Sequence, residues 1–233
     1  MKIRLLILLA VVFIAGLSAC KKNNDMPVIT SMVGLNIINA SADTVNIYLN
    51  GTRLNNGSNL LPGISTGYYS VPAGEQSYQF KSAFNTTGST VKTLFSKTLP
   101  VDSSFYRSLF VTDETAAGAF TLDDVLLTDT LANTCLVRFV NASPDAGTLN
   151  VAFGDTTQFK SIPYRSASDF VLVGVSGVKP VKIFPANSTT PLLSTKVDLG
   201  AGVSYTFYSK GKLKGTGTAA FSLGMTTNTT LGN

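Results

Sequence analysis

The sequence predicts an all-β protein built from two tandem antiparallel β-sandwich domains of the Ig-like or transthyretin-like type. Three observations lead to this fold class: an internal repeat, alternation of apolar and polar residues within each copy, and turn residues (Gly, Pro, Asn, Ser) between the apolar runs. Short strands separated by such turns at this density are typical of a sandwich. After the first twenty residues, no long segment has the 3.6-residue spacing of an amphipathic helix.

The internal repeat consists of three segments that occur twice in the same order. From first copy to second they are 39–43 and 141–145, 119–122 and 220–223, and 130–133 and 230–233, at offsets of 102, 101 and 100. A nearly constant offset over the whole chain indicates a duplicated unit. We therefore expect one sandwich at 34–133 and a second at 134–233.

Strands are expected throughout the first copy. Apolar and polar residues alternate from Val45 to Asn50 and again over Leu35–Ile37, which predicts half-buried strands. Asn50-Gly51 predicts a type I′ hairpin turn, because both central positions of that turn need positive φ. The other strands expected here are 68–71, 78–81, 93–99, 106–112 and 120–127.

The second copy repeats this pattern. Val137 and Phe139 alternate with Arg138, at the place that Leu35–Ile37 occupies in the first copy. The remaining strands expected here are 170–175, 178–184, 193–199, 203–209 and 221–225. A domain of this size buries enough surface to fold without disulfides, so the two cysteines of the chain are no obstacle.

The N-terminus has the pattern of an export signal. Basic residues at Lys2 and Arg4 precede an apolar stretch, Leu5–Gly16, that is too short to span a bilayer. Leu17-Ser18-Ala19-Cys20 resembles the lipobox of bacterial lipoproteins, which implies cleavage before Cys20 and lipidation of its thiol. We expect a lipoprotein signal peptide at 1–19 and a lipidated tether at 20–33; an ordinary secretory signal and a short anchor are the alternatives.

Residues 137–146, which read VRFVNASPDA, resemble the opening of the domain of unknown function 4397 (DUF4397). Residues 199–206 are similar to the family's glycine turn and following strand. Asn141, and Asn39 in the first copy, stand where the family often has histidine. The resemblance is closer over 134–210 than over 34–112. It implies an exported lipoprotein of the Bacteroidetes type with two copies, and it supplies no catalytic residues.

Composition excludes several kinds of chemistry. The chain has no histidine, which removes the commonest general base and metal ligand. We therefore expect no enzyme, no metal site and no cofactor. The carboxylates at 113–114 and at 123–124 are expected to be solvated in loops, with a weak cation site as the alternative. Cys135 is expected to be a small buried apolar residue.

Tyrosines provide the first candidate ligand-binding residues. Tyr48 is on the polar side of its strand, and Tyr68 and Tyr69 adjoin a glycine. Exposed tyrosine rings can stack on sugar faces, although tyrosine in a sandwich more often buries its ring and hydrogen-bonds its hydroxyl at a corner.

Charge provides the second set of candidates. The first copy carries five basic and eight acidic residues, the second nine and four. Lys210, Lys212 and Lys214 alternate, so in an extended segment they would share one face and attract an acidic polymer; ordinary solubilising lysines are the alternative. The repeated motif at 39–43 and 141–145 is expected to form a turn after the first strand, or alternatively a polar ligand-binding rim made by both copies.

Together these features predict a lipid-anchored, extracytoplasmic, non-enzymatic module that binds an unknown ligand or has a structural role in the envelope. A glycan-binding accessory lipoprotein of a polysaccharide uptake system is the alternative. The expected location is the outer membrane, at its periplasmic face or at the cell surface. The expected partners are the membrane, through the lipid on Cys20, and an acidic polysaccharide or another envelope protein; nucleic acid is not expected.

Overall fold

The computed structural model describes residues 31–55, 57–83, 91–101, 106–126, 132–154, 156–175 and 177–229. From Ser31 onward the chain forms one compact unit. In the described part of the chain, the only helices are two short 3₁₀ turns, η1 (Ala116–Gly118) and η2 (Gly217–Ala219), which confirms the all-β prediction. None of the described helices has the length and apolar character to cross a membrane. The expected signal peptide and the tether up to residue 30 lie outside the described residues.

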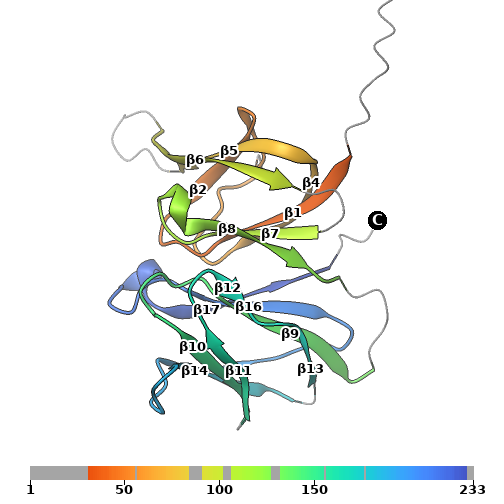
Figure 1. Cartoon of the computed structure of the whole chain (residues 1–233), viewed down its shortest axis with the longest axis vertical. Coiled ribbons are helices and arrows are strands. Elements are labelled where there is room, and N and C mark those ends of the chain that lie inside the picture. The colour runs from red at the N-terminus through yellow and green to blue at the C-terminus, as the bar shows by residue number, and fades with distance from the viewer. Residues whose placement is uncertain are drawn as a thin grey trace, which may run out of the picture. The chain divides into compact units, whose positions relative to one another are not determined.

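The first copy is a sandwich of two four-stranded sheets (Figure 1), in the orders β4-β1-β7-β8 and β3-β2-β5-β6. Leu35, Ile47, Tyr78 and Phe80 are among the fully buried residues between the two sheets. The strands are β1 (Met32–Asn39), β2 (Val45–Leu49), β3 (Thr52–Arg53), β4 (Ser65–Pro72), β5 (Gly74–Ser82), β6 (Thr93–Val101), β7 (Tyr106–Val111) and β8 (Ala119–Asp124).

The second copy repeats the same strand orders. Its sheets are β12-β9-β16-β17, with β13 also on β9, and β11-β10-β14-β15. The strands are β9 (Thr134–Asn141), β10 (Leu149–Phe153), β11 (Thr156–Ile162), β12 (Ser166–Ala167), β13 (Val171–Gly174), β14 (Lys179–Pro185), β15 (Leu193–Val197), β16 (Ser204–Lys210) and β17 (Ser222–Thr227). The expected strands did not include β10 and β11 or the two short strands β3 and β12.

The sheets are antiparallel except for one pair in each copy. β1 runs parallel to β7, and β9 runs parallel to β16. In each case the first strand of the copy lies beside a strand from near its end. The tight connection at Asn50-Gly51 is confirmed, because both residues have positive φ, at 47° and 87°, and Leu49 pairs with Thr52.

The alternation over Leu35–Ile37 and around Arg138 does not produce half-buried strands, and that expectation is wrong. Asn36 is 0% exposed and Arg138 is 3% exposed. The physical reason is a second buried face: the sheet that contains β1 packs against the sheet that contains β9 (Figure 1). A third apolar cluster lies between these sheets, made of Ile38, Ala40, Phe110, Phe120, Val140, Ala142 and Tyr208.

The repeated motif forms the turn that the sequence predicts after the first strand of each copy. Asn39 Nδ2 donates to the carbonyls of Asp43 at 2.7 Å and Leu60 at 3.0 Å, and its Oδ1 accepts from the amide of Ser41. Asn141 makes the corresponding bonds to two carbonyls and to the following serine amide. An amide side chain fits both places because it donates and accepts at once.

Candidate functional site

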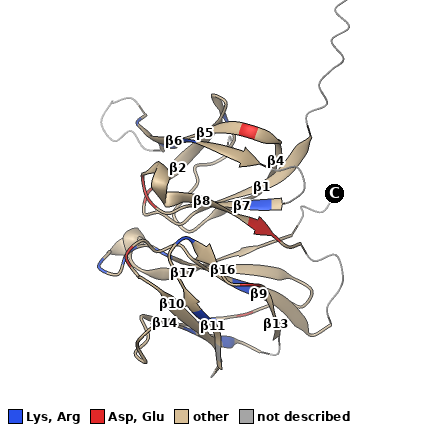
Figure 2. Cartoon of the chain, viewed as in Figure 1, with Lys and Arg blue, Asp and Glu red and all other residues tan. Residues whose placement is uncertain are grey.

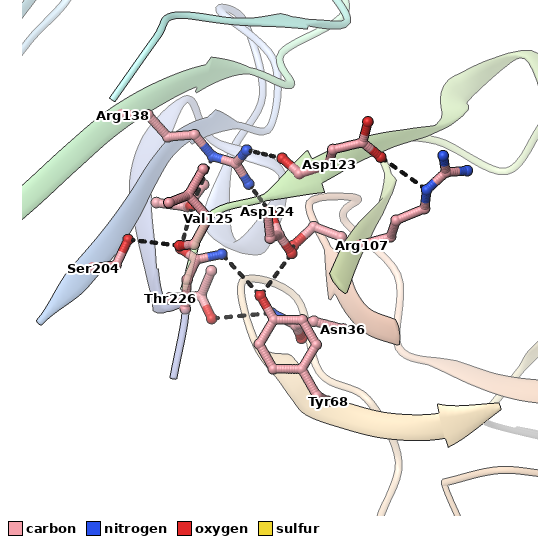
Figure 3. Close-up of polar contacts among 12 residues, drawn as sticks. Asn36, Tyr68, Arg107, Asp123, Asp124, Val125, Arg138, Ser204 and Thr226 are labelled. Atoms are coloured by element: carbon pink, nitrogen blue, oxygen red, sulfur yellow. Dashed lines mark hydrogen bonds and ion pairs between the residues drawn. The ribbon is translucent and has the colours of Figure 1, made fainter. Parts of the chain in front are cut away.

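A buried ion pair joins the two copies at the end of β8 (Figure 3). The guanidinium of Arg138 on β9 contacts the carboxylate of Asp124, and the two side chains are only 4% and 0% exposed. Arg138 Nη1 also donates to the carbonyl of Asp123 at 2.7 Å, and its Nε donates to Thr206 Oγ1 at 2.9 Å. Its remaining face lies 4.8 Å from the centre of the Phe170 ring. The guanidinium is therefore well supplied with partners from both copies.

The second carboxylate oxygen of Asp124 is also occupied. Tyr68 and Ser108 each donate a hydroxyl to Oδ2 at 2.7 Å, and Asn228 Nδ2 donates to the Tyr68 hydroxyl at 3.0 Å. Burial raises the pKa of the Asp124 carboxyl, and the positive charge of Arg138 opposes that rise. Burial and the neighbouring carboxylate raise the pKa of the Tyr68 phenol, so Tyr68 remains a hydrogen-bond donor.

The expectation that residues 123–124 form a solvated loop is wrong for Asp124. β8 continues to Asp124 on the sheet that faces the second copy, and its carboxylate is sequestered there. Asp123 points the other way, is 57% exposed and pairs with Arg107 at 2.8 Å. Opposite orientations of neighbouring residues follow from the period of a strand.

The two copies place different residues at matching positions of this interface. Asn36 on β1 lies beside Ser108 on β7, and Arg138 on β9 lies beside Thr206 on β16. Asn36 donates only a long hydrogen bond, 3.4 Å, to Thr226 Oγ1. The buried ion pair at this junction therefore joins an arginine of the second copy to an aspartate of the first.

Beside the ion pair, the ring of Tyr68 lines an open pocket of about 270 Å³ on the first copy. The rings of Tyr68 and Tyr106 meet edge to face, with centres 5.1 Å apart and planes at 78°. Tyr106 lies directly over Gly34, since a Cβ atom at Gly34 would come within 2.2 Å of the ring. The pocket therefore has two aromatic walls at a corner and bare backbone between them. Its lining residues are Met32, Val33, Gly34, Tyr68, Tyr69, Ser70 and Tyr106.

The structure brings two of the three candidate tyrosines together. Tyr68 and Tyr69 both line this pocket. Tyr48 lies on β2, in the other sheet, with the ammonium of Lys81 4.0 Å from its ring centre. Sequence reasoning missed Tyr106, although its strand was expected. The available signal was Gly34, because a lone glycine inside a strand often marks a close approach by another group.

The three candidate lysines do not lie along one extended segment, so that part of the prediction is wrong. β16 ends at Lys210, and a turn follows in which the amide of Gly215 donates to the carbonyl of Lys212. Lys210 is half-buried against Gly63, and burial lowers the pKa of its ammonium. Lys212 and Lys214 are exposed. Figure 2 shows basic residues spread over several strands of the second copy. A role for the three lysines in binding stays a prediction.

Both copies contribute to a second cavity, of about 380 Å³. It is lined by Ser41, Ala42 and Asp43 of the repeated motif, by residues 112–115, and by Lys212 of the second copy. A polar concavity made by both copies is therefore present, and ligand binding there stays a prediction. Among the described residues, no group of three or more potential side-chain ligands is arranged to hold a metal ion.

Cys135 is fully buried, as expected, and its Sγ lies 3.6 Å from the carbonyl of Val173. Burial raises the pKa of the thiol, which keeps it in the unreactive protonated form.

Comparison with known proteins identifies the repeated unit. The family model described as domain of unknown function (DUF4397) matches residues 33–152 and 135–231. The chain belongs to the DUF4397 family. Each DUF4397 match begins within the first strand of a copy, β1 or β9, and these are the strands that carry Asn36 and Arg138 into the interface.

No curated protein matches this DUF4397 chain. Among solved structures, it is similar to a family 26 carbohydrate-binding module of Eubacterium rectale Amy13K, in complex with maltoheptaose, at 13% identity. The alignment covers 82% of this chain and 96% of the module, with a TM-score of 0.24. At that score, the module's ligand has no bearing on the ligand of the DUF4397 chain.

Proposed function

We propose that this DUF4397 protein is a lipid-anchored, extracytoplasmic, non-enzymatic binding module, and that the tyrosine pocket of its first copy is the ligand site. The observation that carries the proposal is the corner formed by the Tyr68 and Tyr106 rings over Gly34. Concave sites with aromatic walls and a few polar groups are the usual form of small-ligand sites. The anchor is the lipid on Cys20, at the outer membrane.

The chemistry of the corner favours a saccharide ring as ligand. One aromatic face can stack on the apolar face of a sugar while the second ring contacts its edge. The Tyr68 hydroxyl is held by Asp124 and Asn228, so its ring is fixed before the ligand arrives. Because this side chain is already ordered in the free protein, less conformational entropy is lost when a ligand binds. Ser70 and the Tyr106 hydroxyl supply polar groups for the sugar hydroxyls.

Side-chain chemistry supports a non-enzymatic role. The buried carboxylate of Asp124 pairs with Arg138 and accepts hydrogen bonds from Tyr68 and Ser108, so protein groups rather than a substrate occupy it. The thiol of Cys135 is buried and protonated. The chain has no histidine to activate a hydroxyl nucleophile.

The test is binding of immobilised and then soluble oligosaccharides by the purified protein from residue 20 onward, followed by calorimetry with the best ligand. Tyr106→Ala is expected to remove binding, because half of the aromatic corner is lost, while leaving the melting temperature nearly unchanged. Tyr48→Ala is the matched control and is expected to bind normally. Equal binding by wild type and Tyr106→Ala would refute the site.

Anchoring is tested separately in intact cells of the source bacterium. The wild-type protein is expected in the outer-membrane fraction with fatty acid on Cys20, and Cys20→Ser in the soluble fraction. A chain that keeps Met1 and lacks fatty acid in mass spectrometry would refute the anchor without affecting the pocket. Normal anchoring combined with no binding to any oligosaccharide would favour the envelope-structural role.

A further inference from the structure

The second copy has an open groove between the last strands of its two sheets. β15 ends one sheet and β17 ends the other, and a cavity of about 270 Å³ lies between them. Apolar side chains line most of it: Phe207 is fully buried in the core, whereas Met225 is 45% exposed at the rim. The outer backbone edges of both strands have no neighbouring strand among the described residues.

In the first copy, the corresponding edge lies between β6 and β8, the last strands of its two sheets, and a segment of its own chain covers it. There η1 lies beside β6, and its Ala116 packs against the core of the first sandwich. Lys97 on β6 donates to the carbonyls of Ala116, at 2.9 Å, and Ala119. A peptide segment with a small apolar side chain is therefore what completes this type of edge in the same protein.

In the second copy the corresponding segment goes elsewhere. The connection from β7 to β8 consists only of residues 112–118, whereas the connection from β16 to β17 consists of residues 211–221. The longer segment folds on itself through Lys212 and Ala219, and Thr218 Oγ1 donates to the carbonyl of Ala42 in the first copy. No residue of η2 is buried in the second core. Phe221, at the end of this segment, packs against the second core but does not line the groove, so among the described residues the groove stays uncovered.

We propose that the β15–β17 groove of the second copy binds an extended segment of a partner protein, which adds as a strand and places alternate apolar side chains in the groove. Free strand edges on both sides offer the main-chain hydrogen bonds of strand addition, and the groove offers the side-chain pockets. Lys196 lines the groove, and the second copy has nine basic against four acidic residues. The partner segment therefore has acidic residues beside its apolar ones. This site is independent of the tyrosine pocket.

The probe is a fluorescently labelled heptapeptide in which valine and threonine alternate between two terminal glutamates. Fluorescence anisotropy with the protein from residue 20 onward is expected to show saturable binding, and hydrogen exchange is expected to slow at β15 and β17 amides. Met225→Glu is expected to weaken binding by about tenfold or more, because it places a carboxylate at the apolar rim beside the acidic peptide. Leu172→Glu, at an exposed apolar residue on β13, is the matched control and is expected to bind normally.

A second peptide separates strand addition from simple apolar binding. The same heptapeptide with alternate amides N-methylated, prepared in both registers, keeps its side chains and loses the main-chain donors of one edge; the register that blocks the pairing edge is expected not to bind. Equal binding of all three peptides, no saturable binding of the first, or an equal effect of Met225→Glu and Leu172→Glu would each overturn the proposal. Self-association of the protein that Met225→Glu abolishes would also overturn it, since the occupant would then be a second copy of this chain.

Discussion

The guanidinium of Arg138 in the second copy pairs with the carboxylate of Asp124 in the first, and both side chains are buried. Removing two charges from water is costly, and the attraction between them compensates only when other hydrogen bonds satisfy both groups. Here the carbonyl of Asp123 and the hydroxyls of Thr206, Tyr68 and Ser108 provide those bonds. Since the partners come from both copies, the ion pair favours this one arrangement of the sandwiches.

The first prediction concerns the loss of one partner. Asp124→Asn leaves the Arg138 charge buried without a counterion and is expected to lower the free energy of unfolding by about 3–5 kcal/mol. Asp123→Asn is the control and is expected to cost less than about 1 kcal/mol, because that carboxylate is 57% exposed. Urea unfolding of both variants is the measurement. Replacing the pair together, with Arg138→Met and Asp124→Leu, is expected to recover only part of the loss, because the Ser108 hydroxyl then lacks its acceptor; an equal loss in the double variant would contradict the prediction.

Alternation along a strand was enough to predict much of this fold but not this interface. The repeat can be read directly from the sequence and the Asn50-Gly51 turn is a local signal, and both copies have the strand order of a sandwich. Alternation identifies which residues share a face, and it says nothing about a second layer on the polar side. Asn36 and Arg138 were therefore expected to be exposed, and both are buried.

The candidate site was predictable only in part for a similar reason. Tyr68 and Tyr69 were identified because they adjoin a glycine, Gly67, which lies within β4, and both line the pocket. Tyr106 comes from a strand that is distant in sequence, and its position over Gly34 depends on the parallel pairing of β1 with β7. No spacing rule along the chain reveals that pairing.

The second prediction concerns Tyr78, which is fully buried in the core of the first copy. Among the residues that the structure describes, no group hydrogen-bonds its hydroxyl. An unsatisfied buried hydroxyl costs free energy, so Tyr78→Phe is expected to stabilise the protein by about 1 kcal/mol. Thermal and urea unfolding measure the change. A loss of stability in this variant would show that the hydroxyl has a partner after all.

The third prediction is a loss of stability at alkaline pH. Burial raises the pKa of the Tyr78 phenol to about 12 from 10.0, and it also raises the pKa of Tyr208. Between pH 10 and about pH 12 the unfolded chain loses the Tyr78 proton while the folded chain keeps it, so rising pH favours unfolding. The contribution of Tyr78 to stability is therefore fully present below pH 10 and is lost progressively as the pH rises towards 12. Urea unfolding at a series of pH values is the measurement, and Tyr78→Phe is expected to show a shallower decline. A decline of the same slope in that variant would contradict the assignment to Tyr78.

The fourth prediction uses Gly34 to separate the tyrosine pocket from the stability of the fold. An added Cβ would come within 2.2 Å of the Tyr106 ring, and that tyrosine is 38% exposed, so the ring can move outward without disturbing the core. Gly34→Ala is therefore expected to open the aromatic corner and reduce oligosaccharide affinity by about tenfold, a binding loss of about 1.4 kcal/mol. The melting temperature is expected to change little, because alanine suits a strand at least as well as glycine. Calorimetric titration and thermal unfolding of the same preparation measure the two effects. Unchanged affinity in a variant whose Tyr106 ring has demonstrably moved would show that the ligand binds elsewhere on the protein.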